Sequence, residues 1–150
     1  MAGNFIQCYV HIVYSVKARL PLINENVQQD VNKYITGILK RMNELPICIN
    51  GVPDHVHILC GLGSRHSIAD IIKNVKASSS RYLKENGLVH PNFAWQDGYG
   101  LFSVCRSHRD NVVHYIENQQ EHHKKFDFES EYRNLLIENG IAFDEKYLLG

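Results

Sequence analysis

Two hydrophobic periods alternate along this chain of 150 residues, and their order limits the folds that it can adopt. Apolar side chains occupy every second position from Ile6 to Val16, as in a strand with one buried and one mixed face. They recur at helical spacing from Val27 to Met42 and again after Ser67. Strand signals return three more times, at Ile47–Ile49, His55–Leu62 and Tyr99–Val104. This order predicts an α+β fold, the ferredoxin-like split βαββαβ sandwich with an antiparallel sheet.

Capping patterns predict where the later helices begin. A serine followed three residues later by aspartate, a variant of the capping box, occurs at Ser67 and again at Ser107. The second of these predicts a helix that continues to about His123. A last helix is expected near Glu129–Asn139, because Gly140 is a typical C-terminal stop. We therefore expect the sandwich to be followed by C-terminal helices.

Composition excludes several classes of protein. Hydrophobic residues make up 44% of the chain, as in ordinary globular domains. No apolar run approaches the ~20 residues that cross a bilayer, and the N-terminus lacks the basic-then-apolar pattern of a signal peptide. The four cysteines are widely spaced and form no CxxC pair, and without a secretory signal a disulfide framework is not expected. We expect a single domain over residues 1–150, located in the cytoplasm and without membrane contact.

Two histidines in the expected third strand are the first residues with a chemical signature. His55 and His57 are two positions apart, so their side chains share one strand face, which we expect to be exposed. Two neutral imidazoles side by side can begin a divalent-metal site, although surface histidines also occur in pairs by chance. Hydrolases of the histidine-triad type would need a third histidine where Leu59 stands, so that class is disfavoured.

A tyrosine and an amide on one helix face form the second chemical pattern. Tyr115 and Gln119 are four residues apart, although a helical tyrosine is by default a packing residue. A metal ion held by His55, His57 and the Gln119 carbonyl would keep its full charge, because all three ligands are neutral. Such an ion could polarise a phosphodiester while Tyr115, whose phenol is otherwise a poor nucleophile, attacks phosphorus.

The sequence assigns no chemical function to four other histidines. His66, His90 and His123 are interpreted as surface or loop residues, and His11 is not expected to be a metal ligand. Asp54 either orients a neighbouring histidine or shapes the turn that precedes it.

At this point the motifs, taken in order, resemble those of HUH single-tyrosine transposases of the small insertion-sequence and REP-associated type. His55-Val56-His57 matches the family's histidine–hydrophobic–histidine motif, Tyr115 its nucleophile and Gln119 its third metal ligand. The matching stretches cover nearly the whole chain, and further ones lie at His11–Ser15, Trp95–Val104, Tyr115–His123 and Phe143–Tyr147. Tyr14 departs from the family, since a tryptophan is frequent there.

The resemblance implies an enzyme that cuts single-stranded DNA, recognises imperfect hairpins at element ends and forms a 5′-phosphotyrosine while freeing a 3′-hydroxyl. It implies Mg²⁺ or Mn²⁺ as cofactor and a homodimer, in which the tyrosine helix of one subunit often completes the histidine site of the other. In a prokaryote such a protein would be associated with the nucleoid. Whether Tyr115 acts within its own subunit is left open.

Basic residues in the middle of the chain indicate where DNA would bind. The chain carries 16 basic and 16 acidic side chains, but residues 65–125 are net +3 and residues 126–150 are net −4. Phosphate contacts of this kind give affinity rather than sequence choice, and a solvated helix face is the simpler interpretation. The expected DNA-binding residues are Lys73, Lys76, Ser80, Arg81, Lys84, Arg106 and Arg109.

Two other functions compete with a transposase. One is a domesticated protein that binds DNA or RNA hairpins without cutting them, and the other is a structural metal protein. A binding protein has no need of the complete set His55, His57, Tyr115 and Gln119, and a structural metal site would leave Tyr115 without a role.

Overall fold

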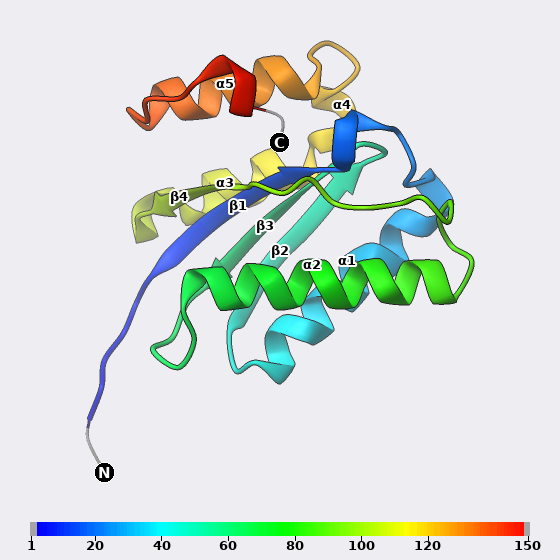
Figure 1. The fold of residues 1–150 in the computed structure, drawn as a ribbon. Helices are drawn as coiled ribbons and strands as arrows, with labels where there is room; N and C mark the ends of the chain where they lie inside the picture. Colours follow the sequence, from blue (N-terminus) through cyan, green and yellow to red (C-terminus); the bar gives the residue numbers. More distant parts are fainter. Residues whose placement is uncertain (1–2, 149–150) are drawn as a thin grey trace.

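A four-stranded antiparallel sheet lies at the centre of the computed structural model, which describes residues 3–148. Its strands are β1 (Tyr9–Ser15), β2 (Leu45–Val52), β3 (His55–Gly61) and β4 (Gly100–Val104). They pair in the order β2-β3-β1-β4 (Figure 1). The first and third strands of the chain are therefore central, which confirms the predicted α+β class and split βαββαβ topology.

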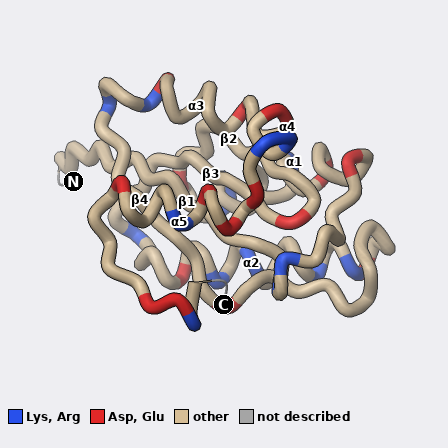
Figure 2. Tube along the Cα trace, turned by 90° about the horizontal axis from the view of Figure 1, so that it is seen from above, with Lys and Arg blue, Asp and Glu red and all other residues tan. Residues whose placement is uncertain are grey.

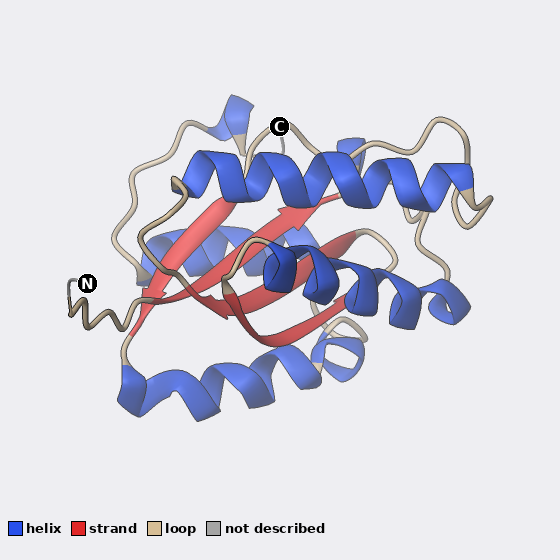
Figure 3. Ribbon diagram, turned by 90° about the horizontal axis from the view of Figure 1, so that it is seen from below, coloured by secondary structure: helices blue, strands red, loops and turns tan. Residues whose placement is uncertain are grey.

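Helices cover both faces of this sheet (Figure 3). α1 (Glu25–Arg41) and α2 (Ile68–Glu85) pack on one face. The other face carries α3 (Arg109–Glu117), α4 (Gln119–His122) and α5 (Phe128–Glu138). Short 3₁₀ turns lie at Lys17–Arg19, Arg106–His108 and Glu145–Tyr147. Among the described residues, no helix is both long and apolar enough to cross a membrane.

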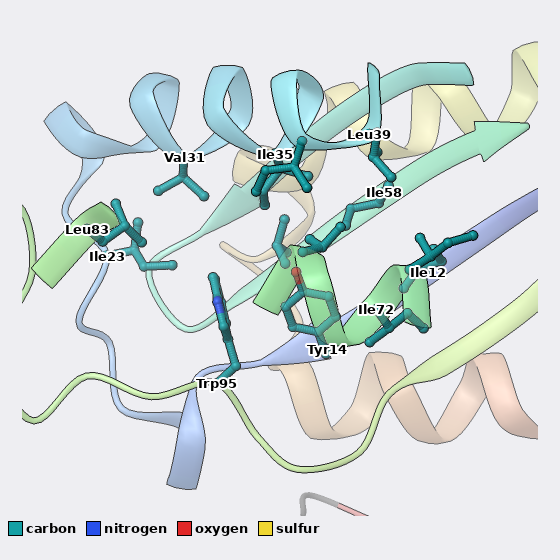
Figure 4. Packing of buried hydrophobic residues seen from close by; sticks show 14 of the residues in the cluster. Ile12, Tyr14, Ile23, Val31, Ile35, Leu39, Ile58, Ile72, Leu83 and Trp95 are labelled. Atoms are coloured by element: carbon teal, nitrogen blue, oxygen red, sulfur yellow. The ribbon is translucent and has the colours of Figure 1, made fainter. Parts of the chain in front are cut away.

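The main core lies between the sheet and helices α1 and α2 (Figure 4). Alternate residues of β1, Ile12 and Tyr14 among them, point into it, together with Ile58 of β3. Val31 and Ile35 of α1 lie one turn apart and meet them from the opposite side. The period of two in the strands and of 3.6 in the helices thus produces one contiguous apolar layer.

The second face of the sheet is buried, which corrects the prediction of an exposed histidine face. His55 and His57 are both 0% exposed. The cause is α5, whose Phe128 and Tyr132 pack against Val13 of β1 in a second apolar cluster. The sequence showed a last helix but not that it folds back over the sheet.

The ends of the helices agree only in part with those predicted from the sequence. Ser67 caps α2 by accepting a hydrogen bond from the Asp70 amide at 3.1 Å, and Gly140 has the left-handed φ of +67° expected after a helix end. Ser107 does not cap α3; its hydroxyl lies 3.2 Å from the Cys105 sulfur, and α3 begins after a 3₁₀ turn. The helix expected to reach His123 is interrupted at Asn118.

Strand β1 is also shorter than expected. It begins at Tyr9 rather than at Ile6, because pairing with Gly61 of β3 and Val104 of β4 starts there. Ile6 is 52% exposed and packs in neither apolar cluster.

Candidate metal and tyrosine site

The two histidines of the site lie on β3, and the Nδ1 atom of each contacts the side chain of another residue. Nδ1 of His55 lies 2.7 Å from Oδ1 of Asp54, so the interpretation of Asp54 as an orienting residue agrees with the geometry. Nδ1 of His57 lies 2.8 Å from Nε2 of His11, a residue of the neighbouring strand β1 that pairs with Leu59. Both Nε2 atoms are thereby turned toward the helices that cover this face.

Tyr115 and Gln119 reach the histidines from α3 and α4. The side-chain oxygen of Gln119 lies 3.3 Å from Nε2 of His55. The ring centroids of Tyr115 and His57 are 5.7 Å apart. The junction of these two helices is linked to β2 by a hydrogen bond of 2.9 Å, which the Asn50 side chain donates to the Ile116 carbonyl. The four residues predicted for chemistry therefore come together within one chain.

Glu131 of α5 lies at the centre of this group, and the sequence interpretation missed it. Its Oε1 lies 3.1 Å from Nε2 of His55 and 3.0 Å from Nε2 of both His57 and His123. Its Oε2 accepts hydrogen bonds from the Tyr115 hydroxyl and, at 3.1 Å, from the Gln119 amide. A single carboxylate thus contacts the imidazoles, the amide and the phenol.

His123 lies in the turn after α4, as expected for a loop residue, but its side chain is not at the surface. Its side chain is only 10% exposed, because its ring packs against His55 at a centroid distance of 4.4 Å. A sequence signal for Glu131 was present. Glu131 stands between Phe128 and Tyr132 on the buried stripe of the last helix, where a carboxylate needs a partner.

Burial and hydrogen bonding shift the protonation equilibria of the site. Burial lowers the pKa of His57 to about 4 and that of His11 to about 3. Burial alone would lower the pKa of His55, but hydrogen bonds to Asp54 and Glu131 outweigh it and raise that pKa. Burial, with the adjacent carboxylate second, raises the pKa of the Tyr115 phenol. Tyr115 is therefore a neutral phenol in this arrangement.

The carboxyl of Glu131 is ionised despite its surroundings. Burial would raise its pKa, but hydrogen bonds to His123, His55 and His57 hold it well below the usual range. An anion among imidazole nitrogens is therefore a stable arrangement here.

The donor set fits a divalent metal ion. One ligand atom from each of His55, His57, His123 and Glu131 lies within 4.8 Å of all the others. Two ligands on opposite sides of one ion are about 4.2 Å apart, since metal–nitrogen and metal–oxygen bonds are about 2.1 Å long. The side-chain oxygen of Gln119 lies next to Nε2 of His55 and would add a neutral ligand to this set.

The residues expected to bind DNA lie in two separate places (Figure 2). Lys73, Lys76 and Ser80 of α2 border a pocket of about 430 Å³ between α2 and the segment that leads to β4. Lys76 is engaged there, because its ammonium donates hydrogen bonds to the carbonyls of Gln96 at 2.7 Å and Gly98 at 2.6 Å. The exposed basic residues on this side are Lys73, Arg81 and Lys84, and Ser80 is half-buried.

The remaining basic residues stand before and at the start of α3. Arg106 is exposed, and Arg109 is half-buried with a hydrogen bond to the Tyr9 hydroxyl at 3.3 Å. Both arginines lie at the N-terminal end of α3, whereas Tyr115 lies in its second half.

Known proteins resemble this chain over most of its length. The family "Transposase IS200 like" matches residues 4–119. The ISDra2 transposase TnpA of Deinococcus radiodurans is 25% identical over 126 residues, which are 79% of this chain and 89% of that protein.

Two solved structures share the fold. A crystal structure of a candidate transposase from Deinococcus radiodurans R1 has a TM-score of 0.60 and 24% identity, covering 79% of this chain and 95% of that one. A REP-associated tyrosine transposase bound to a REP hairpin also has a TM-score of 0.60, at 12% identity, covering 82% of this chain and 73% of that one.

Proposed function

The chain belongs to the IS200-like transposase family, and from this we propose that it cleaves and rejoins single-stranded DNA through a covalent bond to Tyr115. One observation carries the proposal. A phenol, two imidazoles and a side-chain amide, contributed by α3, β3 and α4, meet around Glu131 on the covered face of the sheet. A protein that only binds hairpins would not need these four groups in contact.

Tyr115 is the proposed nucleophile. Its phenolic oxygen forms a bond to phosphorus while the bond between phosphorus and the 3′ oxygen breaks, and that oxygen leaves as a 3′-hydroxyl after gaining a proton. The phenolic proton must leave as the new bond forms, and the Oε2 atom of Glu131 already accepts the hydrogen bond from this hydroxyl. Rejoining reverses the exchange, so the phosphotyrosine stores the energy of the cleaved bond.

His55, His57 and the Gln119 carbonyl are the proposed holders of a Mg²⁺ or Mn²⁺ ion. When bound, the ion would polarise the phosphodiester and offset charge that develops on its oxygens. Asp54 and His11 keep the imidazoles turned toward the site through the contacts at their Nδ1 atoms. These contacts at Nδ1 leave the Nε2 atom of each buried histidine facing the covering helices, where Glu131 contacts both.

Hairpin DNA is the proposed partner. The fold is shared with a REP-associated tyrosine transposase that was solved with a REP hairpin. On this chain the proposed phosphate contacts are Lys73, Ser80, Arg81, Lys84, Arg106 and Arg109. Lys76 is proposed to act indirectly, because its ammonium fixes the segment that forms the other wall of the pocket.

Attack within one subunit is the simpler arrangement for this chain. The hydroxyl of Tyr115 and the imidazole of His57 contact the same Glu131 of their own chain. A homodimer, expected from the family, remains part of the proposal as an assembly that brings two DNA ends together. Exchange of tyrosine helices between subunits is not required to complete the site.

The proposed function is tested with single-stranded oligonucleotides taken from the DNA that flanks the gene, chosen for any imperfect hairpins in it. With Mg²⁺ or Mn²⁺, the wild type should convert part of the DNA to a protein adduct that survives denaturation, and chelation should abolish it. Tyr115→Phe should bind the same DNA without forming the adduct. Binding without any adduct by the wild type would instead support the non-cutting hairpin-binding protein.

A further inference from the structure

Within the described part of the chain, no lysine or arginine forms an ion pair with the carboxylate of Glu131. Among residues 3–148, its ion-pair partners are histidines alone, at distances from 3.0 to 3.4 Å. The residue is only 3% exposed. A buried carboxylate ordinarily needs a compensating charge, and a divalent ion at the imidazole nitrogens would provide one.

The position of Glu131 is fixed by the packing of its helix. Phe128 and Tyr132, three residues before and one after it, are buried against the second face of the sheet. Asp127 caps the first turn by accepting a hydrogen bond from the Ser130 amide at 2.8 Å. The carboxylate therefore approaches the histidines because α5 packs where it does, and not because a flexible side chain reaches toward them.

We propose that Glu131 is the anionic ligand of the divalent ion, with His123 beside it, so that metal binding fastens α5 across the site. This inference rests on the metal dependence in the proposed function and adds two residues that the His55, His57 and Gln119 set lacks. Both residues lie beyond the segment 4–119 that the transposase family matches.

Glu131 also connects the ion to the nucleophile. One of its oxygens lies among the imidazole nitrogens, and the other accepts the hydrogen bond from the Tyr115 hydroxyl. A carboxylate fixed at the metal would therefore hold that hydroxyl on the metal side of α3. Glu131 is thus also a positioning residue for Tyr115.

The donor chemistry predicts which ions bind best. Mg²⁺ prefers oxygen ligands and retains water, whereas imidazole nitrogen suits transition metals. A set of up to three imidazoles with one carboxylate should therefore bind Mn²⁺ and Zn²⁺ more tightly than Mg²⁺.

The opposite arrangement is a carboxylate that occupies the position of the ion and must be expelled when metal binds. The two arrangements predict opposite effects on metal affinity and on the rigidity of α5. If Glu131 is a ligand, its removal weakens metal binding and metal makes α5 more rigid. If Glu131 competes with the ion, its removal strengthens metal binding and metal loosens α5.

The test is calorimetric titration of Mn²⁺ into full-length, chelator-stripped protein. We expect Glu131→Gln to weaken Mn²⁺ binding by about tenfold or more. Glu138→Gln, an exposed substitution on the same helix, is the matched control and should bind as the wild type does. Equal or tighter binding by Glu131→Gln would overturn the inference.

A second measurement needs no substitution. Hydrogen exchange at the α5 amides of the wild type should slow by about tenfold or more when Mn²⁺ is added, because the ion ties the helix to β3. Unchanged or faster exchange would overturn the inference. If adduct formation at Tyr115 persists in that case, the proposed function stands and only the role of Glu131 fails. Absence of Mn²⁺ binding by the wild type would overturn both.

Discussion

The hydroxyl of Tyr115 donates a hydrogen bond to Oε2 of Glu131, a residue on a different helix. The proposed nucleophile is thus held by the carboxylate that also contacts His55 and His57. Because both histidines are 0% exposed, a phosphodiester can reach them only when part of the covering layer gives way. In this structure the proposed reactive groups are therefore assembled but covered.

Asp54 should matter for metal affinity more than for folding. Asp54→Asn removes the carboxylate that lies 2.7 Å from Nδ1 of His55, so the imidazole loses its fixed orientation. Orienting partners of this kind are worth about 10- to 100-fold in metal affinity. Calorimetry with Mn²⁺ measures the effect, with Asp97→Asn in an exposed loop as the control. Unchanged affinity in Asp54→Asn would mean that the aspartate only shapes its turn.

Mixing two inactive variants should distinguish attack within a subunit from attack between subunits. Tyr115→Phe lacks the proposed nucleophile and His57→Ala lacks a proposed metal ligand. If each chain uses its own tyrosine, as the contacts around Glu131 favour, a mixture of the two stays inactive in hairpin cleavage. Recovery of cleavage in the mixture would show that subunits exchange tyrosine helices. Mixtures of each variant with wild type serve as controls.

Protonation of His11 should make the metal-free protein less stable in acid. Burial lowers the pKa of His11 from 6.5 to about 3, so the unfolded chain binds a proton that the folded chain excludes. The stabilisation is present above pH 6.5 and is lost as the pH falls from there toward 3. The contribution to the slope is about 1.4 kcal/mol per pH unit.

Urea unfolding in chelator at several pH values between 7 and 4 measures this slope. His11→Gln should reduce the pH dependence of the unfolding free energy by an amount that corresponds to at most one bound proton. His90→Gln, at an exposed loop position, serves as the control. A slope in His11→Gln equal to that of the wild type would contradict the buried, neutral state assigned to His11.

The exposed lysines of α2 should bind DNA backbone. Lys73→Ala and Lys84→Ala should each weaken hairpin binding about equally for any sequence and reduce the salt slope of binding by about 1. Lys33→Ala, exposed on α1, is the matched control. Fluorescence anisotropy at several salt concentrations provides the measurement. If only Arg106→Ala affects binding, the DNA lies by the start of α3 instead.

The fold was predictable because its signals are local. Alternation in β1 and β3 and helical spacing in α1 and α2 each lie within one short segment, and a capping pair such as Ser67 and Asp70 spans three residues. His55 and His57 are more than fifty positions from Tyr115 and Gln119, so no local pattern joins the two pairs. Their relation was inferred from the chemistry that they could share and from resemblance to a family.

The missed part of the site depends on tertiary packing. Nothing between positions 123 and 131 says that α5 folds back over β1 and β3, and that placement alone buries His123 and brings Glu131 to the imidazoles. The pattern at Ser107 predicted a cap, but the chain enters α3 through a 3₁₀ turn, which leaves that hydroxyl beside Cys105. Local propensity was overridden there by the path into the site.

The most direct measurement is mass spectrometry of the protein–DNA adduct after trypsin and nuclease digestion. The peptide 110–124 contains Tyr115 as its only tyrosine. Nucleotide mass attached at Tyr115, dependent on divalent metal and absent from Tyr115→Phe, is the result that this account predicts. Cleaved hairpin DNA with the adduct on another residue, or with no adduct, would contradict it.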